Sequence, residues 1–127
     1  MLTRMRIPRH PTLVRRFRDA RVKQLARAKS LLAGSLVRIA KHCGRAGCRC
    51  QPARRGGRGE KHVGWYLTRY HAGKTQTTYV PVDLVREVRA WVKEHRRVRG
   101  LVQDISELNR ALIRLHVTEK ERRRGRS

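Results

Sequence analysis

The sequence predicts an α+β fold: a small three-stranded antiparallel sheet with a candidate zinc knuckle, flanked by an N-terminal basic helix and a long C-terminal helix or coiled coil. Three observations support this prediction. Two runs rich in aromatic and β-branched residues meet at a short turn, apolar residues follow a heptad spacing after residue 98, and all three cysteines lie between residues 43 and 50. We expect three segments: a basic arm and helix (1–33), a knuckle and sheet (34–81), and a helical segment with a basic tail (82–127).

The N-terminal segment begins as a basic arm and continues as a helix. Residues 1–11 contain Pro8 and Pro11 and show no apolar period, which indicates an arm without regular structure. Thr12 can cap the helix that follows. Apolar residues then recur at roughly helical spacing up to a predicted stop at Gly34; they are Leu13, Phe17, Leu25, Ala28 and Leu32.

The sheet is predicted from three short runs. Residues 35–41 contain β-branched residues in partial alternation, which is typical of a strand. Residues 64–70 and 74–80 form a predicted hairpin with its turn at 71–73. A sheet of this size needs a helix on one face, and Trp65, Leu67 and Val80 are candidates for the packed side.

The C-terminal segment is predicted to be one long helix. Pro81 ends the last strand, and Asp83 and Glu87 lie where negative charge favours the start of a helix. Gly100 costs about 1 kcal/mol relative to alanine inside a helix and is a candidate kink. An apolar seam at heptad spacing calls for a partner helix, either residues 12–33 folding back or the same segment of a second chain; it consists of Val98, Leu101, Ile105, Leu108, Leu112 and Leu115.

The cysteine cluster has the donor set of a structural zinc site. Cys43, Cys48 and Cys50 offer three thiolates, and His62 offers an imidazole in the spacing C-x4-C-x-C-x11-H. Two alternatives stay open here: His42 can replace His62, or the thiols are reduced and metal-free. A disulfide framework is disfavoured because the cysteine count is odd and no secretory signal is present. We therefore expect a reducing compartment, the cytoplasm.

The charge of the chain points to a polyanionic partner. Lys and Arg number 33 against 9 Asp and Glu, and the formal net charge is +24. Asp19 and Glu60 are the only acidic residues up to position 81, so the first two thirds of the chain should face the anion. No apolar run is long enough to span a membrane. The expected phosphate contacts are Arg38, Lys41, Arg45, Arg49, Arg54, Arg55, Arg58, Arg69 and Lys74, and the expected base-stacking residues are Tyr66, Tyr70 and Tyr79.

Several runs resemble an uncharacterised bacterial domain-of-unknown-function family. They are residues 34–37 (GSLV), 43–50 (CGRAGCRC), 62–67 (HVGWYL), 73–81 (GKTQTTYVP) and 105–109 (ISELN). The family pattern that they resemble is C-G-K-P-x-C-x-C, H-G-P-Y and G-G-K-T-x-T-x-Y-V-P. The resemblance covers about residues 34–115. It departs at Arg45-Ala46 and Val63-Gly64, while all four candidate metal ligands are kept. The resemblance implies an association with transposases and mobile elements.

These observations favour a basic nucleic-acid-binding protein, expected to be a DNA-binding accessory protein of a bacterial mobile element. Duplex DNA is favoured because of the mobile-element association, while single strands and structured RNA stay open. A DNA-binding protein of this kind would be associated with the nucleoid. The alternatives are an RNA- or ribosome-binding protein and a coiled-coil adaptor to a transposase, acting as a homodimer or with a partner protein through residues 98–115. No enzyme activity is expected, because a metal-dependent nuclease needs several carboxylates.

Overall fold

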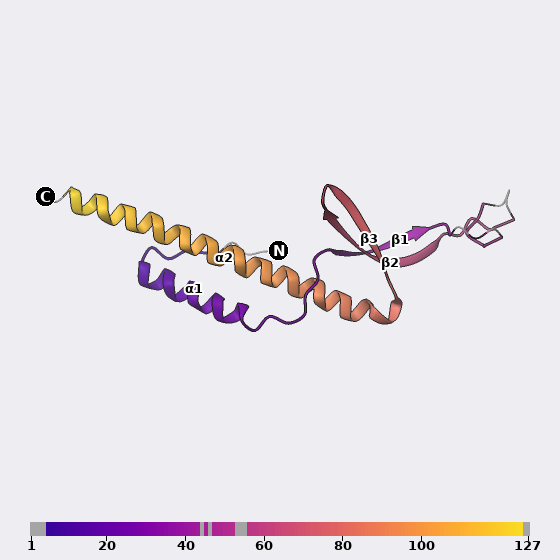
Figure 1. Ribbon diagram of the computed structural model, residues 1–127, viewed down its shortest axis with the longest axis horizontal. Coiled ribbons are helices and arrows are strands. Elements are labelled where there is room, and N and C mark those ends of the chain that lie inside the picture. Colours follow the sequence, from indigo (N-terminus) through magenta and orange to yellow (C-terminus); the bar gives the residue numbers. More distant parts are fainter. Residues whose placement is uncertain (1–4, 44, 46, 53–55, 126–127) are drawn as a thin grey trace. The chain divides into compact units, whose positions relative to one another are not determined.

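The computed structural model describes residues 5–43, 45, 47–52 and 56–125. The elements follow in the order α1 (Pro11–Leu25), β1 (Ser35–Lys41), β2 (His62–His71), β3 (Lys74–Val80), the short 3-10 helix η2 (Val82–Leu84) and α2 (Val85–Arg124) (Figure 1). The predicted α+β fold is confirmed, because one antiparallel sheet is accompanied by an N-terminal helix and a long C-terminal helix.

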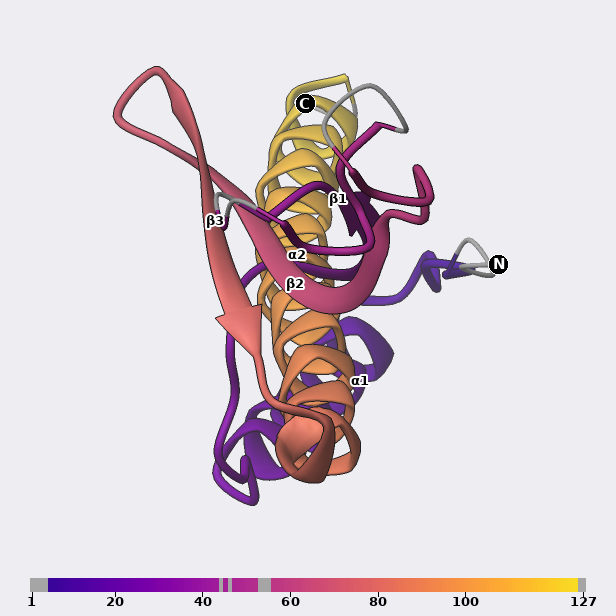
Figure 2. The same cartoon turned by 90° about the vertical axis from the view of Figure 1, so that its right-hand side faces the viewer.

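The sheet has the strand order β1-β2-β3, with both neighbouring pairs antiparallel. β2 curves between its two neighbours (Figure 2). Its hairpin with β3 closes through Ala72 and Gly73, which have φ of 51° and 80°. Two consecutive residues with positive φ are typical of the tight turns whose twist matches that of the flanking strands, and glycine adopts this conformation without steric cost.

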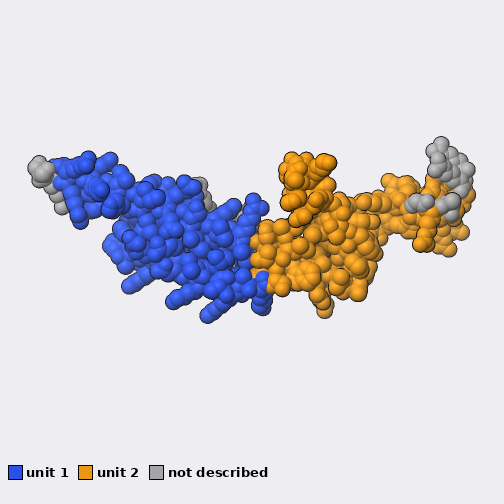
Figure 3. Space-filling model, viewed as in Figure 1, with its two compact units in different colours: residues 1–29, 96–127 blue, residues 30–95 orange. Residues whose placement is uncertain are grey.

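The chain forms two compact units, each of which is described separately (Figure 3). Unit 2 comprises residues 30–95 and contains the sheet and the first turns of α2. Its core is formed by Leu67 and Val80 from the sheet and by Val88 and Val92 from the helix. The prediction that Trp65, Leu67 and Val80 belong to the packed side is confirmed, with Trp65 partly buried against this core.

Unit 1 comprises residues 1–29 and 96–127. Val14 of α1 packs against Leu108 and Ala111 of α2, and all three side chains are buried. Arg21 Nε donates to Asp104 Oδ2 at 3.0 Å beside this core. The predicted seam on α2 therefore has a partner within the same chain, supplied by α1 and by Met5 and Ile7 of the preceding arm.

The N-terminal helix is shorter than the predicted span, because α1 ends at Leu25 and not near Gly34. Leu32 fits the helical spacing of the apolar residues, but it lies outside α1 and packs against the core of unit 2. Its backbone N donates to the carbonyl oxygen of Trp91 at 3.0 Å, so this part of the chain runs along α2 without helical bonds of its own. Gly34 then enters β1 with φ of 140°, a conformation that favours glycine.

Two details of the helix ends also differ from expectation. The N-cap of α1 is His10, whose Nδ1 accepts from the backbone N of Thr12 at 3.2 Å, so Thr12 is not the cap. Gly100 does not break α2, which continues through it as one helix. Within the described residues, no helix combines the length and the apolar character needed to cross a membrane.

Candidate functional site

Four metal-ligand atoms converge at the end of the sheet where β1 stops and β2 begins. Cys43 follows β1, Cys48 and Cys50 lie in the connecting loop, and His62 is the first residue of β2. The four ligand atoms all lie within 4.8 Å of one another. Cys48 Sγ is 3.1 Å from His62 Nε2, and Cys50 Sγ is 3.4 Å from Cys43 Sγ. This group, which we call the Cys3His cluster, includes His62 and not His42.

Backbone and amide hydrogen bonds hold the loop in this conformation. The backbone N of Cys43 donates to Cys50 Sγ at 3.1 Å, and Gln51 Nε2 donates to the carbonyl oxygen of Cys43 at 2.9 Å. The backbone N of Gln51 donates to the carbonyl oxygen of Cys48 at 3.0 Å. Gln51 thus ties both ends of the cysteine loop together, a role that nothing in the sequence pattern indicated.

The chain beyond the last cysteine folds back onto the same loop. The backbone N of Arg58 donates to the carbonyl oxygen of Arg49, and that of Gly59 donates to the carbonyl oxygen of Gln51, both at 2.8 Å. These bonds bring the chain around to β2, so that His62 reaches the cysteines. The chain just before β2 is therefore joined to the cysteine loop by specific backbone contacts.

The two cysteines nearest the centre of the loop differ in acidity. The pKa of Cys48 is lowered to about 6, first by a backbone hydrogen bond from Cys50 and then by hydrogen bonds with the side chains of Cys43 and His62. Burial raises the pKa of Cys50, whose side chain is fully buried. At neutral pH, Cys48 is therefore mostly in the thiolate form already in the metal-free protein, and the thiolate is the form that binds a metal ion.

The donor set fits a closed metal site. Three sulfur atoms and one imidazole nitrogen supply the number and types of ligand that tetrahedral structural sites use. Two thiolates on one ion lie roughly 3.8 Å apart when each metal–sulfur bond is about 2.3 Å. The 3.4 Å separation of Cys43 Sγ and Cys50 Sγ is close to that value. These four residues can hold a metal ion with only small adjustments of their side chains.

The register of the sheet sorts the predicted nucleic-acid contacts between its two faces. Directly paired residues share a face, so Leu36, Leu67 and the pair of Trp65 with Val80 all lie on the face that packs on α2. The residues between them in each strand lie on the opposite face. That opposite face, which we call the tyrosine face, carries all three tyrosines of the chain, and its members are Ser35, Val37, Ile39, Lys41, His62, Gly64, Tyr66, Thr68, Tyr70, Thr75, Thr77 and Tyr79.

The aromatic rings of the tyrosine face have defined contacts. Tyr66 and Tyr79 are register partners, and their rings meet edge to face with centroids 5.6 Å apart. Lys41 Nζ lies 4.3 Å from the centroid of the Tyr66 ring, a cation–π distance. Tyr79 is 59% exposed and Tyr70 is 78% exposed. The expected stacking residues are thus brought together on one surface with a cation among them.

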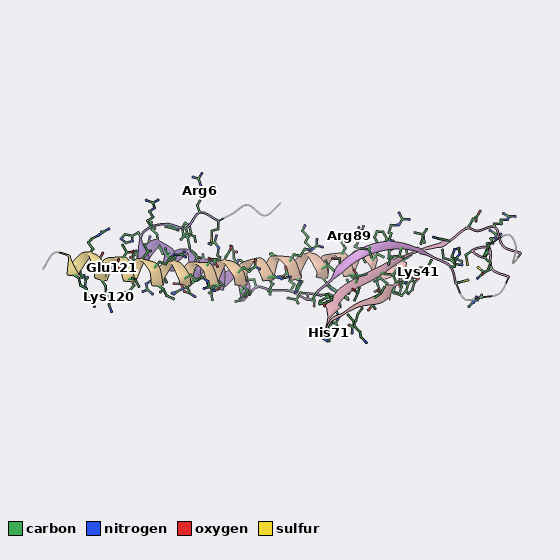
Figure 4. All side chains as sticks on the ribbon, turned by 90° about the horizontal axis from the view of Figure 1, so that it is seen from above. Arg6, Lys41, His71, Arg89, Lys120 and Glu121 are labelled. Carbon is green, nitrogen blue, oxygen red and sulfur yellow. The ribbon has the colours of Figure 1, made fainter. Side chains whose placement is uncertain are left out.

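Arg38 lies on the other face of the sheet. Its guanidinium lies over the Trp65 ring at 5.5 Å from the centroid, and Arg89 of α2 lies over the same ring at 5.4 Å. Figure 4 labels Lys41 on the sheet and Arg89 on the helix. Arg89 was missed by the sequence prediction, because its position beside Trp65 depends on how α2 packs against the sheet.

The remaining predicted phosphate contacts lie at the two ends of the sheet. Arg69 Nε donates to Gln76 Oε1 at 2.9 Å, and Lys74 is exposed next to the hairpin turn. Arg45, Arg49 and Arg58 are exposed around the Cys3His cluster. Arg54 and Arg55 lie outside the residues that the structure describes.

Comparison with known families gives one match. A family model described as a domain of unknown function, DUF6788, matches residues 11–90. No curated protein and no solved structure matches the chain. The matched residues include the Cys3His cluster, the whole sheet and α1.

Proposed function

The chain belongs to the DUF6788 family, a domain of unknown function, and we propose that it binds nucleic acid through the cations of its sheet and cysteine loop. One observation carries the proposal. Between residues 30 and 81, Glu60 is the only acidic residue, so the cations of this region greatly outnumber the carboxylates that could neutralise them. A surface of this kind attracts a polyanion and releases its counterions on binding.

The contacts of individual cations support the proposal. Lys41 and Arg38 lie over aromatic rings, which orient the cations without neutralising their charge. In unit 1 the arrangement is different, because Arg18 contacts Asp19 and Arg21 contacts Asp104. Cations that stabilise the fold are thus paired with carboxylates, whereas these two sheet cations keep their charge available for phosphate groups.

We further propose that the Cys3His cluster binds zinc as a structural ion. Zinc prefers thiolate and imidazole ligands in a tetrahedral arrangement, and a site with four protein ligands has no open position for a substrate. A zinc ion would join the end of β1 to the start of β2 and hold Arg45 and Arg49 in place between them. The backbone N of Cys43, which donates to Cys50 Sγ, would help to orient this sulfur toward the ion.

The proposed role is binding and not catalysis. Nuclease and transposase centres hold divalent cations with several carboxylates, and the sheet and cysteine loop have only Glu60. Within that role we propose DNA as the partner and a bacterial mobile element as the context, on the strength of the motif resemblance. The coiled-coil adaptor is less well supported, because Val14 covers the seam at Leu108 and also packs against the neighbouring Ala111.

The salt dependence of DNA binding tests the proposal. The observed binding constant of a labelled duplex, measured by fluorescence anisotropy, should fall steeply with salt, with a log–log slope of about −0.9 for each phosphate contact. Replacing Lys41, Arg45 and Arg49 by Gln should make the slope shallower by about 3. The same replacement of Lys120, Arg122 and Arg123 at the end of α2 is the matched control, and we expect a smaller change. Absence of salt-dependent binding would contradict the proposal.

A further inference from the structure

The tyrosine face has the surface chemistry of a site for unpaired bases. Resting on the proposed nucleic-acid binding, we propose that this face binds single-stranded DNA by stacking bases on Tyr70 and Tyr79, with Lys41 near the phosphates. α2 packs on the opposite face of the sheet, through the core that contains Leu67 and Val80. The aromatic rings of the tyrosine face therefore do not belong to that core.

The rings are arranged as a platform. An added Cβ at Gly64 would lie 3.2 Å from Tyr66 Cε2 and 3.6 Å from Tyr79 Cε2, so both rings lie close to this glycine, which is two residues before Tyr66 on β2. Half-buried Val37 and Ile39 extend the same face on β1. Tyr70 stands further along β2, next to the hairpin turn, and is the most exposed of the three tyrosines. This spread of rings along the strands offers successive positions to successive bases.

The cations lie where a phosphate backbone would need them. Lys41 is the register partner of His62, so both side chains project from the tyrosine face, at the end of the sheet next to the Cys3His cluster. Exposed Arg45, Arg49 and Arg58 surround that end. A DNA strand whose bases stack on the tyrosines would continue toward these cations. Its negative phosphates and the positive side chains of the protein would then be complementary in charge.

A duplex fits this surface less well than a single strand. In a duplex the flat faces of the bases are stacked on each other, and a protein can reach only their edges and the phosphates. Exposed aromatic rings gain from stacking only when the bases are unpaired. This differs from the expectation of duplex binding, which came from the mobile-element resemblance and not from the surface.

The side chains of the tyrosine face favour DNA over RNA. Recognition of RNA depends strongly on the ribose 2′-hydroxyl, which requires well-placed hydrogen-bonding groups. The face as defined contains no Asp, Glu, Asn or Gln side chain. Its hydroxyl groups belong to Ser35, Thr68, Thr75, Thr77 and the tyrosines, and that of Thr68 already donates to the carbonyl oxygen of Ser35. The rest of the surface is aromatic, aliphatic and basic, which suits a base and a phosphate.

Four ligands test the inference in the full-length protein. They are a mixed-sequence DNA strand of about 12 nucleotides, an abasic strand of the same length, the RNA strand of the same sequence, and the DNA duplex, all compared at about 0.2 M salt. The abasic strand keeps the phosphates and lacks the bases. We expect the DNA strand to bind about tenfold more tightly than the abasic strand, because stacking supplies the difference.

Matched variants assign that difference to the tyrosines. Tyr70→Ala with Tyr79→Ala should abolish the preference for the strand with bases, and Tyr70→Phe with Tyr79→Phe should keep it, since phenylalanine still stacks. Thr78→Ala, next to Tyr79 but on the opposite face, is the control and should change nothing. If the Ala pair fails to fold, the Phe pair and the abasic comparison still decide the result.

Other outcomes would overturn the inference in distinguishable ways. Equal binding of the abasic strand, or an unchanged preference in the Ala pair, would remove base stacking while leaving the proposed nucleic-acid binding intact. Tighter binding of the duplex would overturn the single-strand assignment, and tighter binding of RNA would overturn the choice of DNA. Failure of all four ligands to bind at any salt concentration would contradict the proposed function as well.

Discussion

His62 Nε2 lies 3.1 Å from Cys48 Sγ, although the two residues are 14 positions apart in the chain. The contact joins the start of β2 to the loop that follows β1, and it completes the Cys3His cluster. The ends of two neighbouring strands are thereby tied at one point. A metal ion at this point would stabilise the loop and the sheet together.

Removal of the metal should destabilise the sheet. We expect about one zinc ion per chain in the purified protein by elemental analysis, and a lower melting temperature after a chelator removes it. Cys48→Ser should lose most of the metal, because Cys48 is one of the four ligands. Lys61→Ser, at the exposed position next to His62, serves as the control and should keep a full metal content.

Acid should release the same ion, because protons compete with a metal for thiolates. In the metal-free protein the lowered pKa of Cys48, about 6, means that this thiol is mostly deprotonated at neutral pH, and the bound ion competes with protons for the same sulfur. Metal retained in the Cys48→Ser protein, or a melting temperature that does not change when a chelator removes the metal, would contradict the proposal that the Cys3His cluster binds a structural zinc ion.

Two glycines should respond in opposite ways to replacement by alanine. At Gly34, with φ of 140°, an added Cβ would lie 2.8 Å from the carbonyl oxygen of Thr68, so Gly34→Ala should lower the free energy of unfolding by at least about 1 kcal/mol. At Gly100 inside α2 nothing lies within 4 Å of the added atom, so Gly100→Ala should raise it by about 0.5–1 kcal/mol. Chemical denaturation measures both changes, and a destabilising Gly100→Ala would indicate that the helix is not continuous there.

Loss of the Leu108 side chain should destabilise unit 1. Leu108 is fully buried in the cluster that it forms with Val14 and Ala111, and Leu108→Ala should lower the free energy of unfolding by about 2–5 kcal/mol because it leaves a cavity. Ile113→Ala removes a similar side chain that is 66% exposed on the same helix and should cost within about 0.5 kcal/mol.

The dependence of the melting temperature on protein concentration distinguishes the two candidate partners of the apolar seam on α2, which are α1 of the same chain and the same segment of a second chain. If α1 is the partner, the melting temperature of the unaltered protein is independent of its concentration. A melting temperature that rises with concentration would instead indicate a seam shared between two chains.

The parts of the fold that depend on local sequence were predictable. The hairpin was readable because aromatic and β-branched runs flank a turn with Gly73, and these preferences act between residues close in the chain. The end of α1 was not, because Leu32 continues the apolar period but its backbone bonds to Trp91 and its side chain joins the core of unit 2. Contacts between distant segments overrode the local pattern there.

The candidate site divides in the same way. The sequence by itself determined the donor types of the metal cluster, the excess of cations around it, and the strands that carry the tyrosines, since composition and spacing are local properties. Only the tertiary structure decided that His62 and not His42 completes the cluster, that Arg38 and Arg89 share the Trp65 ring, and that all three tyrosines lie on one face. The physical reason is that strand register and helix packing bring together residues far apart in the chain, and these are settled by the burial of the core as a whole.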